Sequence, residues 1–452
     1  MIFINKISGI LIFFSFLTTI YAYFFQNDFL IVAGVLAWLS SALLFFTLKH
    51  KKILLILLSL SFFAFLFSYI NGFKIDFVKA FTVNQYLLTL LIAVGFLKLI
   101  ATPKKEKNHL LPKGKQSFIK TYLSVHLFGS VINISSLLLV ADKMYKKSPL
   151  NPAQIVLLTR AFASDAYWSP FFVAFAAAIT YAPNLQTYTI ISFGIFLAIT
   201  AFMITYFDVT KDKKFNIDEF NGYPLSLETL YLPIILAILV LSTHYFFPNL
   251  KVIVLISTFS ILMTLFILPL KKNFSEALKI LKYHILNELP KMKSEISLFL
   301  VAGLFGILIG SVLTGLNFSL PFEVFDYKVA SLLLLIFILL AFIGIHPIIT
   351  IAMIGDFFIN ANHTLLAMTF LMAWSTTVST SPISGLNLTI VARYNCSAKE
   401  IFMLNIFYAL KMYIVCVICL FVLSKYSKYL KRFLVLFFAL LSKIFPLYIN
   451  IV

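Results

Sequence analysis

Long apolar runs separated by short polar links fill the chain from near its N-terminus to about residue 423. A helix needs roughly 20 predominantly apolar residues to cross the hydrocarbon core of a membrane. Unbroken runs of about that length predict membrane-spanning helices at 7–25, 29–48, 53–71, 81–102, 187–207, 229–247, 252–270, 296–316 and 401–423. The pattern therefore predicts an all-α polytopic membrane protein.

Two further runs are interrupted by polar residues and predict re-entrant hairpins. Residues 121–147 contain "VINISS" around Asn133, and both flanks of this run are rich in lysine. A hairpin that enters the membrane and returns keeps both lysine clusters on one side. Residues 329–358 break at "GIHP", Gly344 to Pro347, and predict a second hairpin.

Two more runs are interrupted by a Ser-Pro pair and predict helices that unwind in the middle. Residues 150–182 contain "YWSPFF" and residues 364–393 contain "STSPIS". Irregular backbone at membrane depth is tolerated where it is buried in protein or lines a cavity. The four interruptions therefore predict a polar cavity inside the membrane.

The order of segments repeats, and the loop charges indicate that the second half starts from the opposite side. Cytoplasmic loops carry an excess of lysine and arginine. This rule places the N-terminus and the link 208–228 in the cytoplasm and predicts an inverted repeat with about 11 spans, two hairpins and two broken helices. Its parts are an extra span (1–28), a first repeat (29–207, with scaffold spans 29–102), a second repeat (229–423, with scaffold spans 229–316) and a tail (424–452).

One stretch disagrees with this topology. The basic segment "SKYSKYLKRF" follows the last span, where the count places it outside, unless residues 433–450 add a crossing.

Composition agrees with an inner-membrane protein and disfavours other classes. The chain is 61% hydrophobic and 12% charged, and its mean hydropathy is +1.00. The net charge of +19 comes mostly from lysines in the links, so we expect no nucleic-acid partner. No phosphate-binding loop or metal-ligand spacing is present, and the three cysteines are best explained by packing. We expect no cofactor, no metal and no enzymatic activity.

The interruptions supply the candidate chemistry. Pro170, Pro347 and Pro382 each remove a helical donor and free backbone groups. Half-helices that start at such breaks point backbone N–H groups at the midplane, which suits an anion, while freed carbonyls suit a small cation. The candidate solute-binding residues lie at these breaks: Asn133, Ser135, Ser136, Ser169, His346, Ser379, Thr380 and Ser381. A single kink of this kind usually serves only the packing of helices. Four kinks at matching places in the two halves favour a solute-binding site.

Asp165 is the most informative single residue, because a carboxylate at membrane depth usually faces a water-filled cavity or a partner. We assign it to the coupling cation or proton, with Asn133 and Asn387. The alternative is an ion pair with Arg160, five residues earlier. His346 is a candidate to donate to an anion or carry a proton, or else to stabilise freed carbonyls; His126 has the weaker case.

The segments "SVHLFGSVINISSLLLVADKM", "LLAFIGIHPIITIAMIGDFF", "FASDAYWSPFF" and "STSPISGLNL" resemble the hairpins and unwound spans of the ion transporter superfamily, especially divalent anion:sodium symporters. In that family each hairpin tip carries Ser-Asn-Thr. Here the first tip offers Asn133 with Ser135, and the second offers His346 with Pro347. The resemblance implies a homodimer with an elevator-type movement.

The sequence therefore predicts a secondary transporter for a small anionic solute, coupled to sodium or protons. An exporter or cation/proton antiporter of the same superfamily is the alternative. An integral-membrane glycosyltransferase or ligase is disfavoured because the links are short and lysine-rich.

Overall fold

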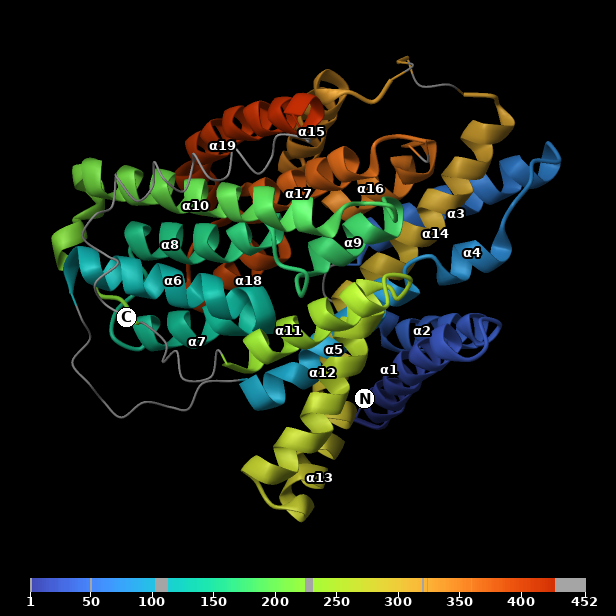
Figure 1. Cartoon of the computed structure of the whole chain (residues 1–452), viewed down its shortest axis with the longest axis horizontal. Helices are drawn as coiled ribbons and strands as arrows, with labels where there is room; N and C mark the ends of the chain where they lie inside the picture. Colours follow the sequence, from blue (N-terminus) through green and yellow to red (C-terminus); the bar gives the residue numbers. More distant parts are fainter. Residues whose placement is uncertain are drawn as a thin grey trace.

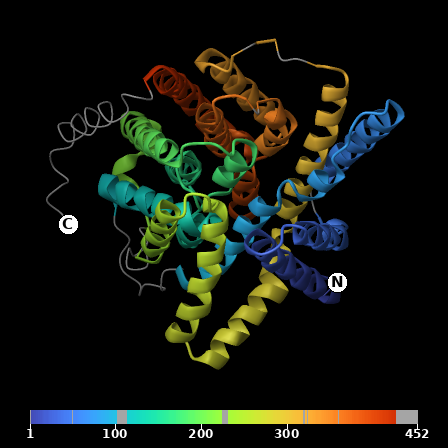
Figure 2. The same cartoon turned by 45° about the vertical axis from the view of Figure 1, so that its right-hand side comes forward.

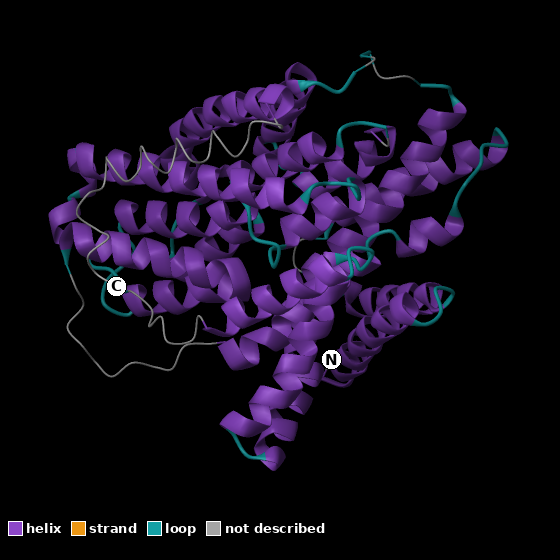
Figure 3. Ribbon diagram, viewed as in Figure 1, coloured by secondary structure: helices purple, strands orange, loops and turns teal. Residues whose placement is uncertain are grey.

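The computed structural model describes residues 2–48, 51–101, 113–223, 231–318, 321–322, 324–358 and 360–426. Helices make up 83% of the structure, and no strand occurs in the part it describes (Figure 3). The apolar runs fold as helices because a chain in lipid must satisfy its backbone hydrogen bonds internally. The predicted all-α class is confirmed.

The first half contains α1 (Ile2–Phe24), α2 (Phe29–Phe45), α3 (Lys52–Ile70), α4 (Phe77–Thr82), α5 (Gln85–Ala101), α6 (Gly114–Ile132), α7 (Ile134–Tyr145), α8 (Pro152–Ala163), η1 (Ser164–Tyr167), α9 (Val173–Tyr181) and α10 (Thr187–Lys211). The second half contains α11 (Tyr231–Phe246), α12 (Val252–Lys271), α13 (Phe274–Tyr283), η5 (His284–Glu288), η6 (Leu289–Met292), α14 (Lys293–Gly315), α15 (Tyr327–Phe342), α16 (Pro347–Ile354), η7 (Gly355–Phe358), α17 (His363–Thr380), α18 (Gly385–Tyr394) and α19 (Ala398–Tyr426).

The helices form two groups that each draw on both halves of the sequence (Figures 1 and 2). In one group α5 packs against α1 and α12, and α14 packs against α3 and α2. In the other group α17 packs against α8, α9, α15 and α19. The groups meet where α14 contacts α16 and where α5 contacts α9.

Among the residues that the structure describes, seven helical stretches are long and apolar enough to cross a membrane: Phe3–Phe24, Lys52–Ile70, Phe77–Ala101, Thr187–Lys211, Val252–Lys271, Phe274–Gly315 and Ala398–Lys425. The predicted spans 29–48 and 229–247 correspond to shorter apolar helices, α2 and α11. These lengths support a multi-pass membrane protein. The total of about 11 spans stays a prediction, and the predicted tail lies outside the described residues beyond Tyr426.

All four predicted interruptions are breaks in helices. The first hairpin turns at Asn133, which has a φ of 51° between α6 and α7. The second breaks after Phe342, where Gly344 has a φ of 108°, a backbone conformation that favours glycine. The broken spans lose regular α-helix at 164–172 and at 381–384. The Ser-Pro and Gly-x-His-Pro patterns therefore located these breaks correctly.

One span differs from the prediction. The sequence predicts 81–102 as one regular helix. The stretch Phe77–Ala101 is long enough to cross a membrane, but Val83 and Asn84 interrupt it between α4 and α5. The side chain of Asn84 donates to the carbonyl of Phe299 at 2.7 Å and accepts from the hydroxyl of Tyr181 at 3.2 Å. Asn84 is buried, and these two contacts satisfy its side chain with partners on α14 and α9.

Candidate functional site

The two broken helices lie against each other in the interior. Ser375 on α17 donates its hydroxyl to the carbonyl of Ala163 at the end of α8, at 2.8 Å. The hydroxyls of Tyr167 and Thr376 lie 3.4 Å apart. All 18 residues of α17 are buried. The packing therefore brings the two interruptions close together without exposing them to lipid.

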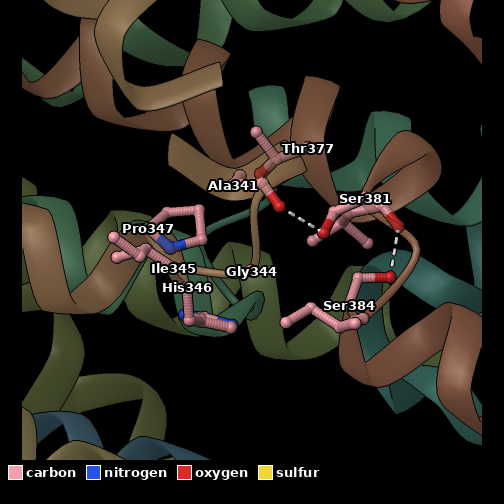
Figure 4. A pocket seen from close by; sticks show the side chains of 10 residues that line it. Ala341, Gly344, Ile345, His346, Pro347, Thr377, Ser381 and Ser384 are labelled. Atoms are coloured by element: carbon pink, nitrogen blue, oxygen red, sulfur yellow. Dashed lines mark hydrogen bonds between the residues drawn. The ribbon is translucent and has the colours of Figure 1, made fainter. Parts of the chain in front are cut away.

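Each Ser-Pro serine makes the same contact with its own hairpin. The hydroxyl of Ser169 donates to the carbonyl of Ser130, near the end of α6. The hydroxyl of Ser381 donates to the carbonyl of Ala341, near the end of α15, at 2.6 Å (Figure 4). The partners are 39 residues apart in the first half and 40 in the second. Equal contacts at nearly equal spacing support the inverted repeat that we predict.

Side chains satisfy the carbonyls that the second break frees. Pro382 has no N–H, and the carbonyl of Val378 accepts from the hydroxyl of Ser384 instead, at 2.8 Å. The amide nitrogen of Asn387 donates to the carbonyls of Ser379 and Ser381 at 3.2 and 2.8 Å. Its side-chain oxygen is buried and has no hydrogen-bond partner among the described residues. Asn387 thus holds the break open and retains one free acceptor.

A small cavity lies between the second hairpin and the second break (Figure 4). Its volume is about 30 Å³, and its lining includes Ile345, His346, Thr377, Ser381 and Ser384. A space of this size holds about one water or a small ion. The present conformation is therefore closed to a larger solute.

His346 presents a donor to this region. Its Nδ1 accepts from the backbone N–H of Ile348 at 3.2 Å and caps the start of α16. With Nδ1 as the acceptor, a neutral ring carries its proton on Nε2. The ring lies edge-on to Trp374, with centroids 5.1 Å apart. Both predicted roles of His346, capping freed backbone and offering a donor, are compatible with this geometry.

The hydroxyl groups are already occupied in this conformation. Ser169, Ser381 and Ser379 each donate to a backbone carbonyl, the last to that of Thr376 at 3.1 Å. The hydroxyl of Thr380 lies 3.3 Å from that of Ser379. A hydroxyl has one proton, so these groups can donate to an oxyanion only after the present bonds break.

The first break contains an ionisable pair. The carboxylate of Asp165 is fully buried, and its Oδ1 lies 2.8 Å from Nδ1 of His126 on α6. The N–H of that nitrogen is directed at the carbonyl of Ala161 at 3.1 Å, and neither oxygen of Asp165 has a well-aligned hydrogen bond among the described residues. His126 is 12% exposed and Asp165 is 0% exposed. The imidazole therefore keeps a small exposed surface, while the carboxylate has none.

Trp168 fixes the tautomer of this imidazole. The indole N–H of Trp168 donates to Nε2 of His126 at 3.1 Å. Indole is a donor only, so Nε2 must be the unprotonated nitrogen and Nδ1 must carry the proton. Trp168 is the first residue after η1, within the break itself.

Gly129 provides the space for the carboxylate. A Cβ at this position would collide with Oδ2 of Asp165 and would lie 3.3 Å from the hydroxyl of Ser136. Ser136 is buried and donates to the carbonyl of Asn133 at 3.0 Å. The turn of the first hairpin and Asp165 are therefore packed directly against each other.

The alternative ion pair between Asp165 and Arg160 is wrong. Arg160 points the other way and donates to three acceptors on α10 and α19, the carboxylate of Asp208 (2.9 Å), the side-chain oxygen of Asn405 (2.8 Å) and the carbonyl of Leu404 (2.9 Å). Asp208 also pairs with Lys411. A helix turns by about 100° per residue, so a five-residue separation puts the two side chains on different faces.

The predicted residues form two clusters instead of one. Asp165, Ser136 and Ser169 belong to the first break, and Ser379, Ser381 and His346 belong to the second. Asn133 and Ser135 are partly buried at the first turn. No described hydrogen bond joins Asn133 or Asn387 to Asp165, which leaves their shared role in coupling a prediction.

Sequence reasoning undervalued His126 and did not name Trp168. The sequence gives His126 a weaker case than His346, because its contact with Asp165 spans 39 positions and no local pattern indicates it. The available signal was that both residues interrupt neighbouring apolar runs at membrane depth, where an ionisable group needs a partner.

The chain matches no protein-family model, and no significant match is found among curated proteins.

Proposed function

We propose that this protein is a secondary transporter that moves a small anionic solute across the inner membrane and is driven by a sodium or proton gradient. The observation that supports the proposal is the pair of helix breaks, each held by a serine to its own hairpin and both packed against each other. Transporters place their sites where interrupted helices from two repeats meet near the midplane.

The groups at the second break suit an anion. α16 starts at the turn of the second hairpin and α18 starts at the second break, and His346 lines the cavity between hairpin and break. Backbone N–H groups at helix N-termini carry partial positive charge. The closed cavity of about 30 Å³ indicates that a larger solute binds only after hairpin and break separate.

The first break supplies the coupling group. Asp165 lies at the interior end of an ionisable pair, on the broken helix that contacts α17. A cation or proton that binds there can therefore alter the position of the helix that lines the second break. We propose the homodimer and elevator-type movement as well, on the resemblance alone.

Solute binding tests the proposal. A panel of small anions would be screened for thermal stabilisation of the purified protein, with and without sodium. Pro170→Ala and Pro382→Ala let each helix continue and should weaken binding of the stabilising anion at least tenfold. Pro183→Ala, in the turn after α9, is the matched control and should change little. If both variants at the breaks keep full affinity, the solute does not bind between them.

A further inference from the structure

We propose that the coupling ion is a proton and that His126 and Asp165 relay it in a way that releases Trp168 from the first helix break. The inference rests on the proposed transport function and specifies the chemistry of its coupling site. It is carried by three contacts, from His126 to Asp165, from His126 to Trp168 and from Asp165 to Gly129.

The surroundings of the carboxylate do not suit a metal cation. Hard cations bind in shells of several oxygen ligands. Oδ1 of Asp165 lies against Nδ1 of His126, and Oδ2 fills the space left by the missing side chain of Gly129. The hydroxyls near the pair are those of Ser164, 3.0 Å from Nδ1 of His126, and Ser136, which lies beside Gly129. A sodium ion would have to displace the imidazole and move α6. A proton needs no such space.

The relay follows from the tautomer. The indole N–H leaves Nε2 of His126, and a proton from water adds there. The imidazole turns its Nδ1–H from the carbonyl of Ala161 toward Oδ1 of Asp165, 2.8 Å away, and this proton passes to the carboxylate. The products are a neutral carboxylic acid and a neutral imidazole with its proton on Nε2. The imidazole takes up one proton at Nε2 and gives one proton from Nδ1 to the carboxylate, so it stays neutral.

The same step breaks the bond to Trp168. Nε2 accepts from the indole N–H before protonation and is itself a donor afterwards, so two N–H groups face each other at the present 3.1 Å. The indole must move away. Trp168 directly precedes Ser169 and Pro170, so its movement shifts the segment that bonds to the hairpin carbonyl of Ser130. Proton binding is thereby converted into a change at the helix break.

No other charged group faces the pair from the described elements around it. Tyr122 on α6 contributes the nearest titratable group, and its hydroxyl lies 3.4 Å from that of Ser164. The neighbouring polar side chains are hydroxyls, that of Ser164, 3.0 Å from Nδ1 of His126, and that of Ser136 on α7. Arg160 is engaged with Asp208 on the far side of α8. A pH response of Trp168 therefore reports on His126 and Asp165.

Tryptophan fluorescence tests the relay directly. The chain contains three tryptophans, and Trp38→Phe with Trp374→Phe leaves Trp168 as the only emitter. In purified protein without solute, the emission of Trp168 should change between about pH 8 and pH 5, the range in which histidine commonly titrates. Exchange of sodium for choline at constant pH should leave the emission unchanged.

His126→Gln in the same background keeps an oxygen that accepts from the indole but cannot be protonated in this range, and the pH response should disappear. If this variant does not fold, Asp165→Asn serves instead. It keeps the imidazole and the indole bond but cannot receive the relayed proton, so the response should vanish above about pH 5.

A pH response that persists in these variants would overturn the relay, and so would a saturable response to sodium. The fluorescence measurement contains no solute. A negative result in it therefore does not affect the proposed anion binding, and a negative result in the anion-binding test does not affect the proposed relay.

Discussion

Gly194 on α10 offers a test of the first break that touches no ionisable group. An alanine Cβ at this position would collide with the carbonyl oxygen of Tyr167 and would lie 2.7 Å from Cα of Trp168. These are backbone atoms of the break, which cannot rotate away as a side chain can. Gly194→Ala should therefore push the break away from α10.

The expected magnitude comes from comparing two helical glycines. Overpacking of this kind lowers the free energy of unfolding by about 1–3 kcal/mol. Replacing a glycine with alanine within a helix raises it by about 1 kcal/mol. Gly310 on α14 has nothing within 4 Å of its Cβ position, so Gly310→Ala keeps the second effect without the first. The difference between the two variants isolates the overpacking, at about 1–3 kcal/mol.

The measurement is the free energy of unfolding of both variants in mixed micelles, titrated with sodium dodecyl sulfate and followed by circular dichroism. Emission of Trp168 in the single-tryptophan background should change in Gly194→Ala and stay constant in Gly310→Ala. Equal stabilities together with equal emission spectra would show that the break does not pack against α10, and the geometry of the relay would then be unsupported.

Three further outcomes are expected. Asp208→Asn should lower the free energy of unfolding more than Arg160→Gln does, by up to about 3 kcal/mol. The first variant leaves the buried Arg160 without a counter-charge, whereas in the second Asp208 still pairs with Lys411. Equal losses in the two variants would contradict this reasoning. Asn387→Leu removes the amide donor from the buried carbonyl of Ser379, while the carbonyl of Ser381 keeps the N–H of Ser384, and should cost about 1–3 kcal/mol in the same assay; a neutral result would mean that water replaces the amide. Cysteines introduced at Lys143 and Asn360 should react with membrane-impermeant reagent from the cytoplasm and from outside, respectively; the reverse pattern would refute the topology.

The helix breaks could be located from the sequence because each has a local cause. Proline lacks the backbone donor that a helix requires, and Pro170, Pro347 and Pro382 stand at the breaks that the structure shows. Asn133 turns the first hairpin because asparagine tolerates the left-handed region. The division at Val83 and Asn84 was missed because its cause is tertiary, a pair of hydrogen bonds to α14 and α9.

Side-chain partners could not be located in this way. Arg160 bonds to residues 48, 244 and 245 positions away, and Asp208 bonds to Lys411 across 203 positions. Such contacts depend on which helices pack together, and a single sequence of apolar runs does not specify that. The same limit explains why the alternative considered for Asp165 is its sequence neighbour Arg160, when the contact in the structure is with His126 on another helix.

If the proposed relay couples transport, the one ionisable pair described in the first break carries one proton per cycle and limits the solute gradient that the proton can drive. One proton crossing a potential of 100 mV delivers about 2.3 kcal/mol, which corresponds to roughly a 40-fold accumulation of an uncharged solute at 1.4 kcal/mol per tenfold. A monoanion that travels with this proton makes an electrically neutral cargo, so the membrane potential does no work on it. Its accumulation then follows the pH difference alone, by a factor of ten for each pH unit.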